Sequence, residues 1–141
     1  MKTVADLILD LQHATGYDRR LDVSIALVMG YKRQVTKAKG KGGEQERKVV
    51  WLYTSGEESR IPFFTAKIDA AKLLAQTLLP GCVGGLTWSP RNATAKINDG
   101  PTFAAATPSL ALCVAALSAK HFQPDEKLYD DYDDDADLTE A

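Results

Sequence analysis

The sequence predicts a single α+β domain with an antiparallel sheet. Segments with the periodicity of a helix alternate with pairs of short segments rich in β-branched and aromatic residues. The two members of each pair are joined directly, as in a hairpin, whereas a parallel sheet needs a long crossover between strands. The expected element order is therefore α-α-β-β-α-β-β-α, and the domain is expected to span residues 1–123.

The first two elements are expected to be helices. Thr3 has the character of an N-cap, Asp6 completes a capping box, and Gly16 marks the end of the first helix. A second helix is expected over 20–29 and ends at Gly30. The apolar faces consist of Val4, Leu7, Ile8 and Leu11 in the first helix, and of Leu21, Ile25, Val28 and Met29 in the second.

Strands are expected at 31–37 and 47–54, because the second of these contains the β-branched and aromatic run VVWLYT. The Gly/Lys-rich loop between them is long for a hairpin. A helix is then expected over 66–79, with Thr65 as its cap and Pro80-Gly81 as its end. Its buried stripe is expected to be Ile68, Ala71, Leu74 and Leu78, with Leu73 beside them.

A second hairpin and a last helix complete the domain. Strands near 84–89 and 92–98 flank the turn SPRN, and Asn98-Asp99-Gly100 forms a further turn. The last helix is expected to be capped by Thr107, with Pro108 at its first position. Its buried stripe is expected to consist of Leu110, Cys113, Val114 and Leu117.

Composition fits a soluble cytoplasmic protein. The chain has 141 residues, 45% hydrophobic and 26% charged, enough for one buried core. Its apolar runs are far shorter than the roughly 18 residues of a membrane span, so no membrane partner is expected. Asp6 and Asp10 argue against a signal peptide. Cys82 and Cys113 are therefore expected to be reduced thiols, and their spacing does not suggest a metal site.

Charge is divided unequally along the chain. Residues 124–141 contain one base, Lys127, and nine acids, which gives −8. Because the whole chain carries −2, the first 123 residues carry +6. The sequence therefore predicts a mildly basic domain and an acidic tail too charged to fold alone. The nine acids are Asp125, Glu126, Asp130, Asp131, Asp133, Asp134, Asp135, Asp137 and Glu140.

Five segments together resemble the phage ABA sandwich domain, a grouping of small phage and prophage proteins. They are LDVSIALVMGY (21–31), VVW (49–51), IPFFTAKIDAA (61–71), LLPG (78–81) and AATPSLALCVAALSA (105–119). The resemblance covers roughly residues 18–121 and implies a three-layer α-β-α sandwich from a phage or prophage. It implies no enzymatic role, and it includes neither the Lys-rich loop nor the acidic tail.

No pattern typical of catalysis is present. The two histidines, His13 and His121, lie near expected helix ends, where the helix dipole favours them. The sequence lacks G-x-S-x-G, H-E-x-x-H and C-x-x-C, and KGKGGEQ lacks the order of a phosphate-binding loop. We therefore expect no catalytic residue, no cofactor and no metal site.

A small-anion site is one hypothesis for function. The expected helix after Thr65 would present free backbone N–H groups and the positive end of its dipole. The aromatic rings could stack on a base and the cations could hold a phosphate. The alternative is that the threonine is only a cap, the rings are core and the cations are solvated. The candidate residues are Trp51, Tyr53, Arg60, Phe64, Thr65, Lys67, Trp88 and Arg91, with Phe63 beside them.

A nucleic-acid surface is a second hypothesis. Seven bases occur between residues 32 and 48, against two acids, Glu44 and Glu46. A basic β-ribbon can lie along phosphates. The alternative is a solvated hairpin whose charges protect an edge strand, and the acidic overall charge does not favour a DNA binder, although the tail is its source. The bases are Lys32, Arg33, Lys37, Lys39, Lys41, Arg47 and Lys48.

Three hypotheses describe the role of the acidic tail. It could occupy the basic hairpin of its own chain, or dock on a basic host protein with Tyr129 and Tyr132 as anchors, or act only as a solubilising segment.

The leading hypothesis combines these features. It is a non-catalytic phage protein, active in the host cytoplasm, that sequesters a small nucleotide-like signal of anti-phage defence as a homo-oligomer with shared pockets. The alternative is a protein- or DNA-interaction module that acts through the basic hairpin or the tail. An accessory virion component is the third.

Overall fold

Four helices and five strands make up the part of the chain that the structure describes. The computed structural model describes residues 3–39, 43 and 45–121, so the expected acidic tail and residues 40–42 and 44 of the Lys-rich loop lie outside it. The α+β class and the antiparallel pairing are confirmed. The elements are α1 (Val4–His13), α2 (Arg19–Met29), β1 (Lys32–Lys39), β2 (Gln45–Leu52), α3 (Ile68–Leu78), β3 (Gly84–Trp88), β4 (Ala93–Ile97), β5 (Thr102–Ala105) and α4 (Pro108–His121).

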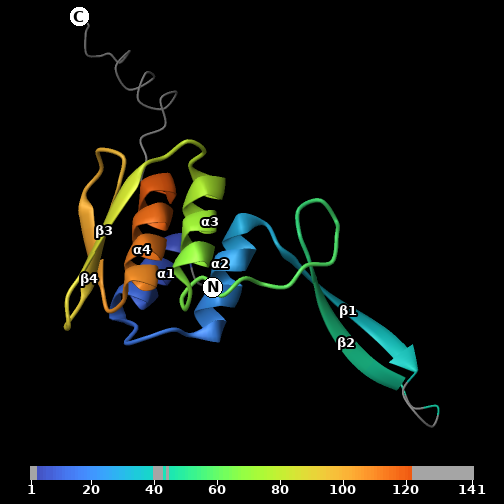
Figure 1. Cartoon of the computed structure of the whole chain (residues 1–141). Coiled ribbons are helices and arrows are strands. Elements are labelled where there is room, and N and C mark those ends of the chain that lie inside the picture. The colour runs from blue at the N-terminus through green and yellow to red at the C-terminus, as the bar shows by residue number, and fades with distance from the viewer. Residues whose placement is uncertain (1–2, 40–42, 44, 122–141) are drawn as a thin grey trace, which may run out of the picture.

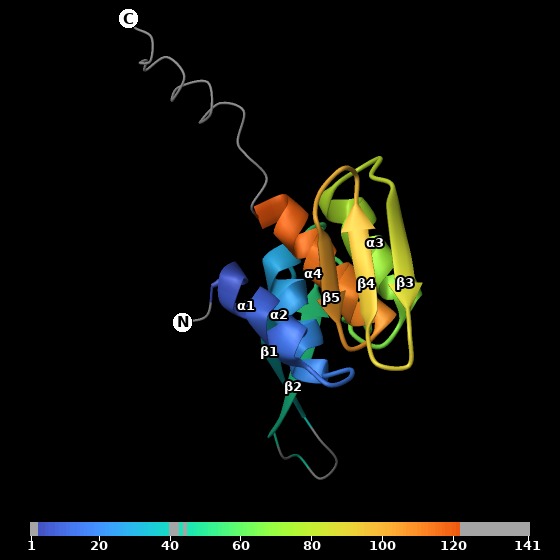
Figure 2. The same cartoon turned by 90° about the vertical axis from the view of Figure 1, so that its left-hand side faces the viewer.

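The strands form two sheets, which differs from the expected single sheet of two hairpins. One is the two-stranded ribbon β1–β2, and the other has the order β3-β4-β5. Figure 1 shows the ribbon projecting from one side of the helices and the three-stranded sheet on the opposite side, and Figure 2 shows the same arrangement from the side of the sheet. Helices therefore cover one face of the three-stranded sheet and do not enclose it as the middle layer of a sandwich.

The burial pattern of the strands explains this layering. In β4, Ala93, Ala95 and Ile97 are buried while Lys96 on the opposite face is exposed, so one face packs on helices and the other faces solvent. The ribbon has no comparable apolar face, because basic side chains occur on both of its faces. It therefore has little apolar surface to bury against a second sheet.

The fifth strand, β5, was not expected from the sequence. It pairs with β4 from Thr102 opposite Lys96 to Ala105 opposite Ala93. The strand has only four residues, and two of them are alanines, which have low strand preference. Pairing with β4 and packing of Ala105 in the core decide the conformation instead.

The helix α4 lies at the centre of the molecule. The backbone N–H of Leu110 donates to the Thr107 hydroxyl at 3.2 Å, which confirms the expected cap. Ten consecutive residues, 109–118, are buried because the sheet, α1 and α3 all pack against this helix. The expected stripe is thus buried, but so are the faces beside it, as in a helix that is surrounded on all sides.

The other helices differ from expectation mainly at their ends. The capping box of α1 is confirmed, with reciprocal bonds between Thr3 and Asp6, but the helix ends at Ala14 rather than Gly16. The helix α2 begins one residue earlier than expected, at Arg19, because the Asp18 carboxylate caps the Arg20 amide at 2.9 Å.

The helix α3 begins at Ile68, two residues later than expected, and Thr65 is not its cap. Lys67 holds the N-cap position without a side-chain capping bond to any described residue. The expected buried stripe is partly wrong, because Ile68 and Leu73 are about half exposed. The buried side chains of this helix are Ala71, Leu74 and Ala75.

Candidate functional site

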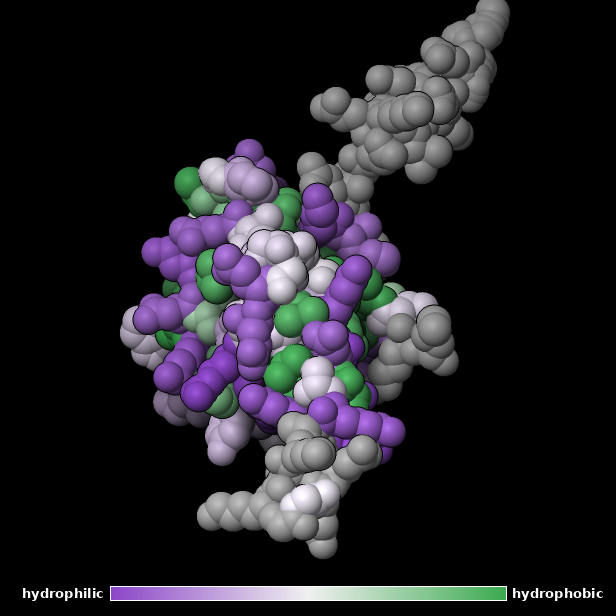
Figure 3. All heavy atoms as spheres, turned by 90° about the vertical axis from the view of Figure 1, so that its right-hand side faces the viewer, coloured by the Kyte–Doolittle hydropathy of each residue, from purple (hydrophilic) through white to green (hydrophobic). Residues whose placement is uncertain are grey.

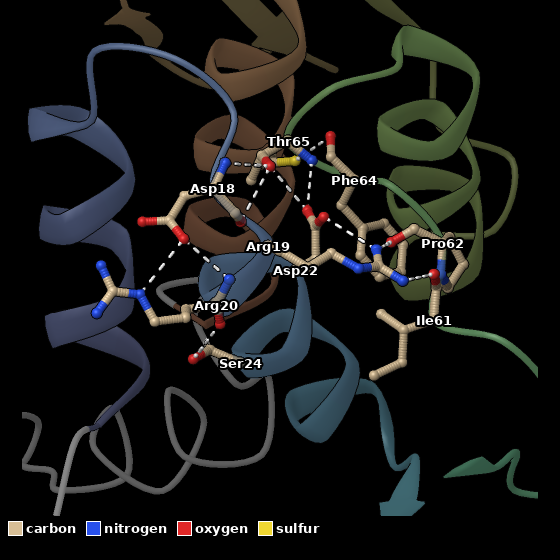
Figure 4. A network of polar contacts seen from close by, with 10 residues as sticks. Asp18, Arg19, Arg20, Asp22, Ser24, Ile61, Pro62, Phe64 and Thr65 are labelled. Atoms are coloured by element: carbon tan, nitrogen blue, oxygen red, sulfur yellow. Dashed lines mark hydrogen bonds and ion pairs between the residues drawn. The ribbon is translucent and has the colours of Figure 1, made fainter. Parts of the chain in front are cut away.

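The segment from Arg60 to Thr65 is fixed by a buried carboxylate of α2. Asp22 has no exposed surface, and its Oδ1 accepts from the backbone N–H and from the hydroxyl of Thr65, both at 2.8 Å. The Thr65 hydroxyl also accepts from the Asp18 amide at 3.0 Å and lies 3.2 Å from the Asp18 carbonyl. Figure 4 shows these contacts converging between α2 and the segment before α3.

Arg19 holds the same segment from outside. Its guanidinium donates to the carbonyls of Ile61 at 2.6 Å and Pro62 at 3.0 Å, and to the Asp22 carboxylate at 3.1 Å. It also lies over the ring of Phe63, 4.1 Å from the centroid. The network thus joins α2 to the chain entering α3.

This network occupies the amide and hydroxyl of Thr65, two of the groups that a small anion was expected to bind. The amide and hydroxyl of Thr65 are both bonded to Asp22, so the protein's own carboxylate stands where a ligand phosphate was expected. The amides of Ala66 and Lys67 donate to the Phe63 carbonyl at 3.1 and 2.9 Å. Phe64 has no exposed surface and belongs to the core. Thr65 and Phe64 are therefore structural residues in this geometry.

Two of the expected aromatic residues lie at the base of the ribbon. Trp51 is half-buried at the end of β2, and its carbonyl accepts from the Ser59 amide at 2.8 Å. Tyr53 packs edge-on against Tyr31, with 5.0 Å between ring centroids. Burial, the largest cause, raises the pKa of Tyr31. Both expected residues thus support the exit of the ribbon from the body.

The remaining expected residues are not gathered into one pocket. Arg60 and Lys67 are exposed, and the Lys67 ammonium lies 5.6 Å from the Phe63 ring centroid. Trp88 and Arg91 belong to the β3–β4 hairpin, on the opposite side of the helices from the ribbon. The candidate residues therefore lie on two distant surfaces of the molecule.

An open hollow of about 460 Å³ lies on the solvent face of the three-stranded sheet. Among the described residues that line it there is one cation, Lys96, and no aromatic ring. It offers small side chains and hydroxyl groups such as Thr87 and Thr94, which bond to each other. The expected hairpin residues Trp88 and Arg91 are not part of its lining.

The ribbon concentrates the exposed basic residues. The backbone of Trp51 bonds to Ser59, on the side away from β1, so the Arg33–Trp51 pair is a non-hydrogen-bonded pair. By alternation, Val35–Val49 and Lys37–Arg47 are pairs of the same kind, in which opposite side chains lie closest. One face of the ribbon therefore carries three cations around a pair of valines.

Among the side chains that the structure describes, the cations of the ribbon have no ion pair with an acid. The ion pairs found there, Arg19–Asp22 and Arg20–Asp18, both lie in the α2 region. Lys37 and Arg47 stand directly opposite each other, an arrangement of like charges that destabilises a strand pair. Figure 3, viewed from the side of the ribbon, shows hydrophilic residues surrounding small hydrophobic groups. The exposed cations are Lys32, Arg33, Lys37, Arg47 and Lys48.

Other kinds of site find no support in the described residues. No cluster of three His, Cys, Asp or Glu in this part of the chain is arranged to hold a metal ion. Among its helices, none has the length and apolar character needed to cross a membrane. No protein-family model, curated protein or solved structure matches the chain. The resemblance to the phage ABA sandwich grouping therefore stays a prediction.

Proposed function

We propose that the protein binds double-stranded DNA through the β1–β2 ribbon. The observation that carries this proposal is a projecting pair of strands whose exposed cations have no acidic partner among the described residues. Burial argues in the same direction, since no described residue between Tyr31 and Ile61 is fully buried, and Trp51 and Tyr53 at the base of the ribbon pack against the core only in part.

Duplex DNA fits the ribbon better than a single strand does. A two-stranded ribbon has the width to enter the major groove of B-form DNA, while its cations contact phosphates. Single strands are held by aromatic rings on which bases stack. In the described part of the ribbon the aromatic residue is Trp51, which is half-buried at the base. The deep, narrow major groove of an RNA duplex excludes such an element.

The like positive charges of Lys37 and Arg47 support an anionic partner. Two cations held at the closest type of cross-strand position repel each other in the free protein. A phosphate placed between them converts that repulsion into attraction, and each neutralised phosphate releases counterions. Binding is therefore expected to be strongly dependent on salt and weakly dependent on sequence.

The test compares two double variants of the full chain by fluorescence anisotropy with a labelled 20-base-pair duplex. Lys37→Gln with Arg47→Gln removes two ribbon charges. Lys72→Gln with Arg91→Gln removes the same charges from exposed positions outside the ribbon. We expect the ribbon variant to bind the duplex at least tenfold more weakly than the native chain at 50 mM salt. In a plot of the logarithm of the DNA-binding constant against the logarithm of salt concentration, its slope should be smaller in magnitude by about two.

Two results would contradict the proposal. Equal weakening by both double variants would show a general effect of net charge. A second would be that the duplex binds neither the full chain nor a full chain whose acidic segment has been neutralised.

Sequestration of a small nucleotide-like anion in the cytoplasm stays a prediction of the sequence, as do a homo-oligomer and a host protein partner. The amide and hydroxyl of Thr65 donate to Asp22, while Arg60 and Lys67 are exposed. Native mass spectrometry of the protein purified from cells with active nucleotide signalling decides these points, because it reports a retained ligand and the subunit count together.

A further inference from the structure

We propose that the acidic segment 124–141 binds the β1–β2 ribbon of the protein and competes there with DNA. This inference rests on the proposed function and adds its regulation. Its first support is charge. The segment carries −8, whereas residues 32–48 contain seven bases and two acids, a net charge of +5. The ribbon cations whose side chains the structure describes have no ion pair with a described acid, so they are available to an anionic partner.

The second support is the chemistry of the ribbon face. Val35 and Val49 stand opposite each other and are 37% and 44% exposed, on the same face as Lys37 and Arg47. Phosphates offer nothing apolar to such a pair. The acidic segment carries Tyr129 and Tyr132 among its carboxylates. The rigid tyrosine rings can pack on the two valines, and the carboxylates beside them can pair with the flanking cations, so the segment matches both the apolar and the charged groups of this face.

The third support is reach. The described chain ends at His121, the last residue of α4, and 20 residues follow. Extended chain spans about 3.3 Å per residue, so Tyr129 and Tyr132, which are 8 and 11 residues beyond His121, reach roughly 26 and 36 Å, and the end of the chain roughly 65 Å. A folded body of this size has a radius of gyration of about 14 Å. The segment is therefore long enough to reach the ribbon of the same chain, where tethering gives it an effective concentration in the millimolar range.

The experiment must separate docking on the ribbon from simple repulsion between the segment and DNA. One full-length variant replaces the nine acids with their amides. A second, Tyr129→Ser with Tyr132→Ser, keeps the charge of −8. DNA affinity is measured by anisotropy at 100 mM salt. We expect at least a tenfold gain for the amide variant and about a threefold gain for the tyrosine variant.

A structural readout accompanies these affinities. Carbodiimide joins carboxylates to amines in direct contact, so cross-linked peptides show what the acids of 124–141 touch. We expect links to Lys37 on the same ribbon face as the valines, and not to Lys72 on α3, which is also exposed and serves as the control.

The outcomes distinguish the inference from the proposed function. A tyrosine variant with unchanged DNA affinity, or links mainly to Lys72, would overturn docking on the ribbon. If the amide variant binds DNA no better than the native chain, while the native chain binds through the ribbon, the inference fails and the proposed function stands. If DNA binds neither protein, the proposed function fails and the inference fails with it.

Discussion

Asp22 has no exposed surface, yet it accepts hydrogen bonds from the amide and hydroxyl of Thr65 and from Arg19. A buried carboxylate is tolerated only when its lone pairs are satisfied in this way. Asp22 and Thr65 are 43 positions apart in the sequence, so no local sequence pattern reveals their contact. Periodicity placed Leu21 and Ile25 correctly on the apolar face of α2, but it also placed Val28 there, which is exposed, and it could not show that Asp22 is buried.

We predict that Asp22→Ala lowers the free energy of unfolding by about 3 kcal/mol, because the Thr65 amide is left buried without an acceptor. Asp22→Asn keeps an acceptor oxygen and is expected to cost about 1 kcal/mol. Urea denaturation measures both. Asp69→Ala, at an exposed site in the first turn of α3, is the control and is expected to cost less than about 1 kcal/mol. A loss for Asp22→Ala no larger than that of the control would show that the network is dispensable.

The buried thiol of Cys113 is expected to make the free energy of unfolding depend on pH. Burial, with a smaller contribution from Asp22, raises the pKa of this thiol far above its ordinary value of 9.0. The native state therefore keeps a proton that the unfolded state loses above pH 9, so the stability from this group is complete below pH 9 and falls as pH rises. Between pH 9.5 and 10.5, native stability should decline by about 1.4 kcal/mol more than that of Cys113→Ser. Urea denaturation at each pH measures both proteins, and the same decline of stability with pH in the native chain and in Cys113→Ser would contradict this prediction.

At the scale of elements, the sequence predicts well those that depend on local signals. The capping box at Thr3, the cap at Thr107 and the hairpin around the SPRN turn are confirmed, because each needs only neighbouring residues. The start of α3 and the strand β5 were wrong or missed, because Thr65 is recruited by α2 and β5 depends on pairing with β4. The candidate small-anion site combined residues that only the fold could show to be far apart.

Gly30 shows how the ribbon leaves the body. It is the αL C-cap of α2, with φ of 104°, and its amide donates to the carbonyls of Ala26 and Leu27. A Cβ at this position would meet the Thr54 side chain at 2.9 Å. Glycine is therefore required here both by the backbone and by the close approach of the segment after β2. The expected end of α2 is confirmed for this reason.

We predict that Lys37→Glu makes the ribbon more stable and its DNA binding weaker. The substitution places a carboxylate opposite Arg47, which replaces repulsion by attraction worth about 0.2–1 kcal/mol. Hydrogen exchange of the ribbon amides should therefore slow by up to about fivefold. Affinity for the labelled duplex should fall at least tenfold at 50 mM salt.

Lys72→Glu gives the same change of net charge on α3 and is the control for Lys37→Glu. It should leave exchange in the ribbon unchanged and alter DNA binding by less than threefold. Faster exchange in the ribbon of Lys37→Glu would show that the like-charge pair does not destabilise the free protein.

At the scale of the whole molecule, folding and the proposed activity belong to different parts. The described core is built from the four helices, the three-stranded sheet and the residues Tyr31, Ile61 and Phe64 around them. The ribbon lies outside this core and projects from it (Figure 1). Such a division allows the ribbon to carry charges that a packed surface would not tolerate, and it makes the two parts separable by experiment.

The last prediction uses this separation. Gln34 and Val50 form a hydrogen-bonded pair, since their neighbours Arg33 and Trp51 form a non-hydrogen-bonded one. A two-residue Asn-Gly turn can therefore join them in place of residues 35–49. We expect the shortened protein to unfold cooperatively within about 5 °C of the native chain, a difference of about 1 kcal/mol, because Trp51 and Tyr53 keep their contacts with the core. Its salt-dependent DNA binding should be lost. Circular dichroism and anisotropy measure the two properties, and a shortened protein that is folded and still binds DNA with native affinity would place the interface elsewhere on the molecule.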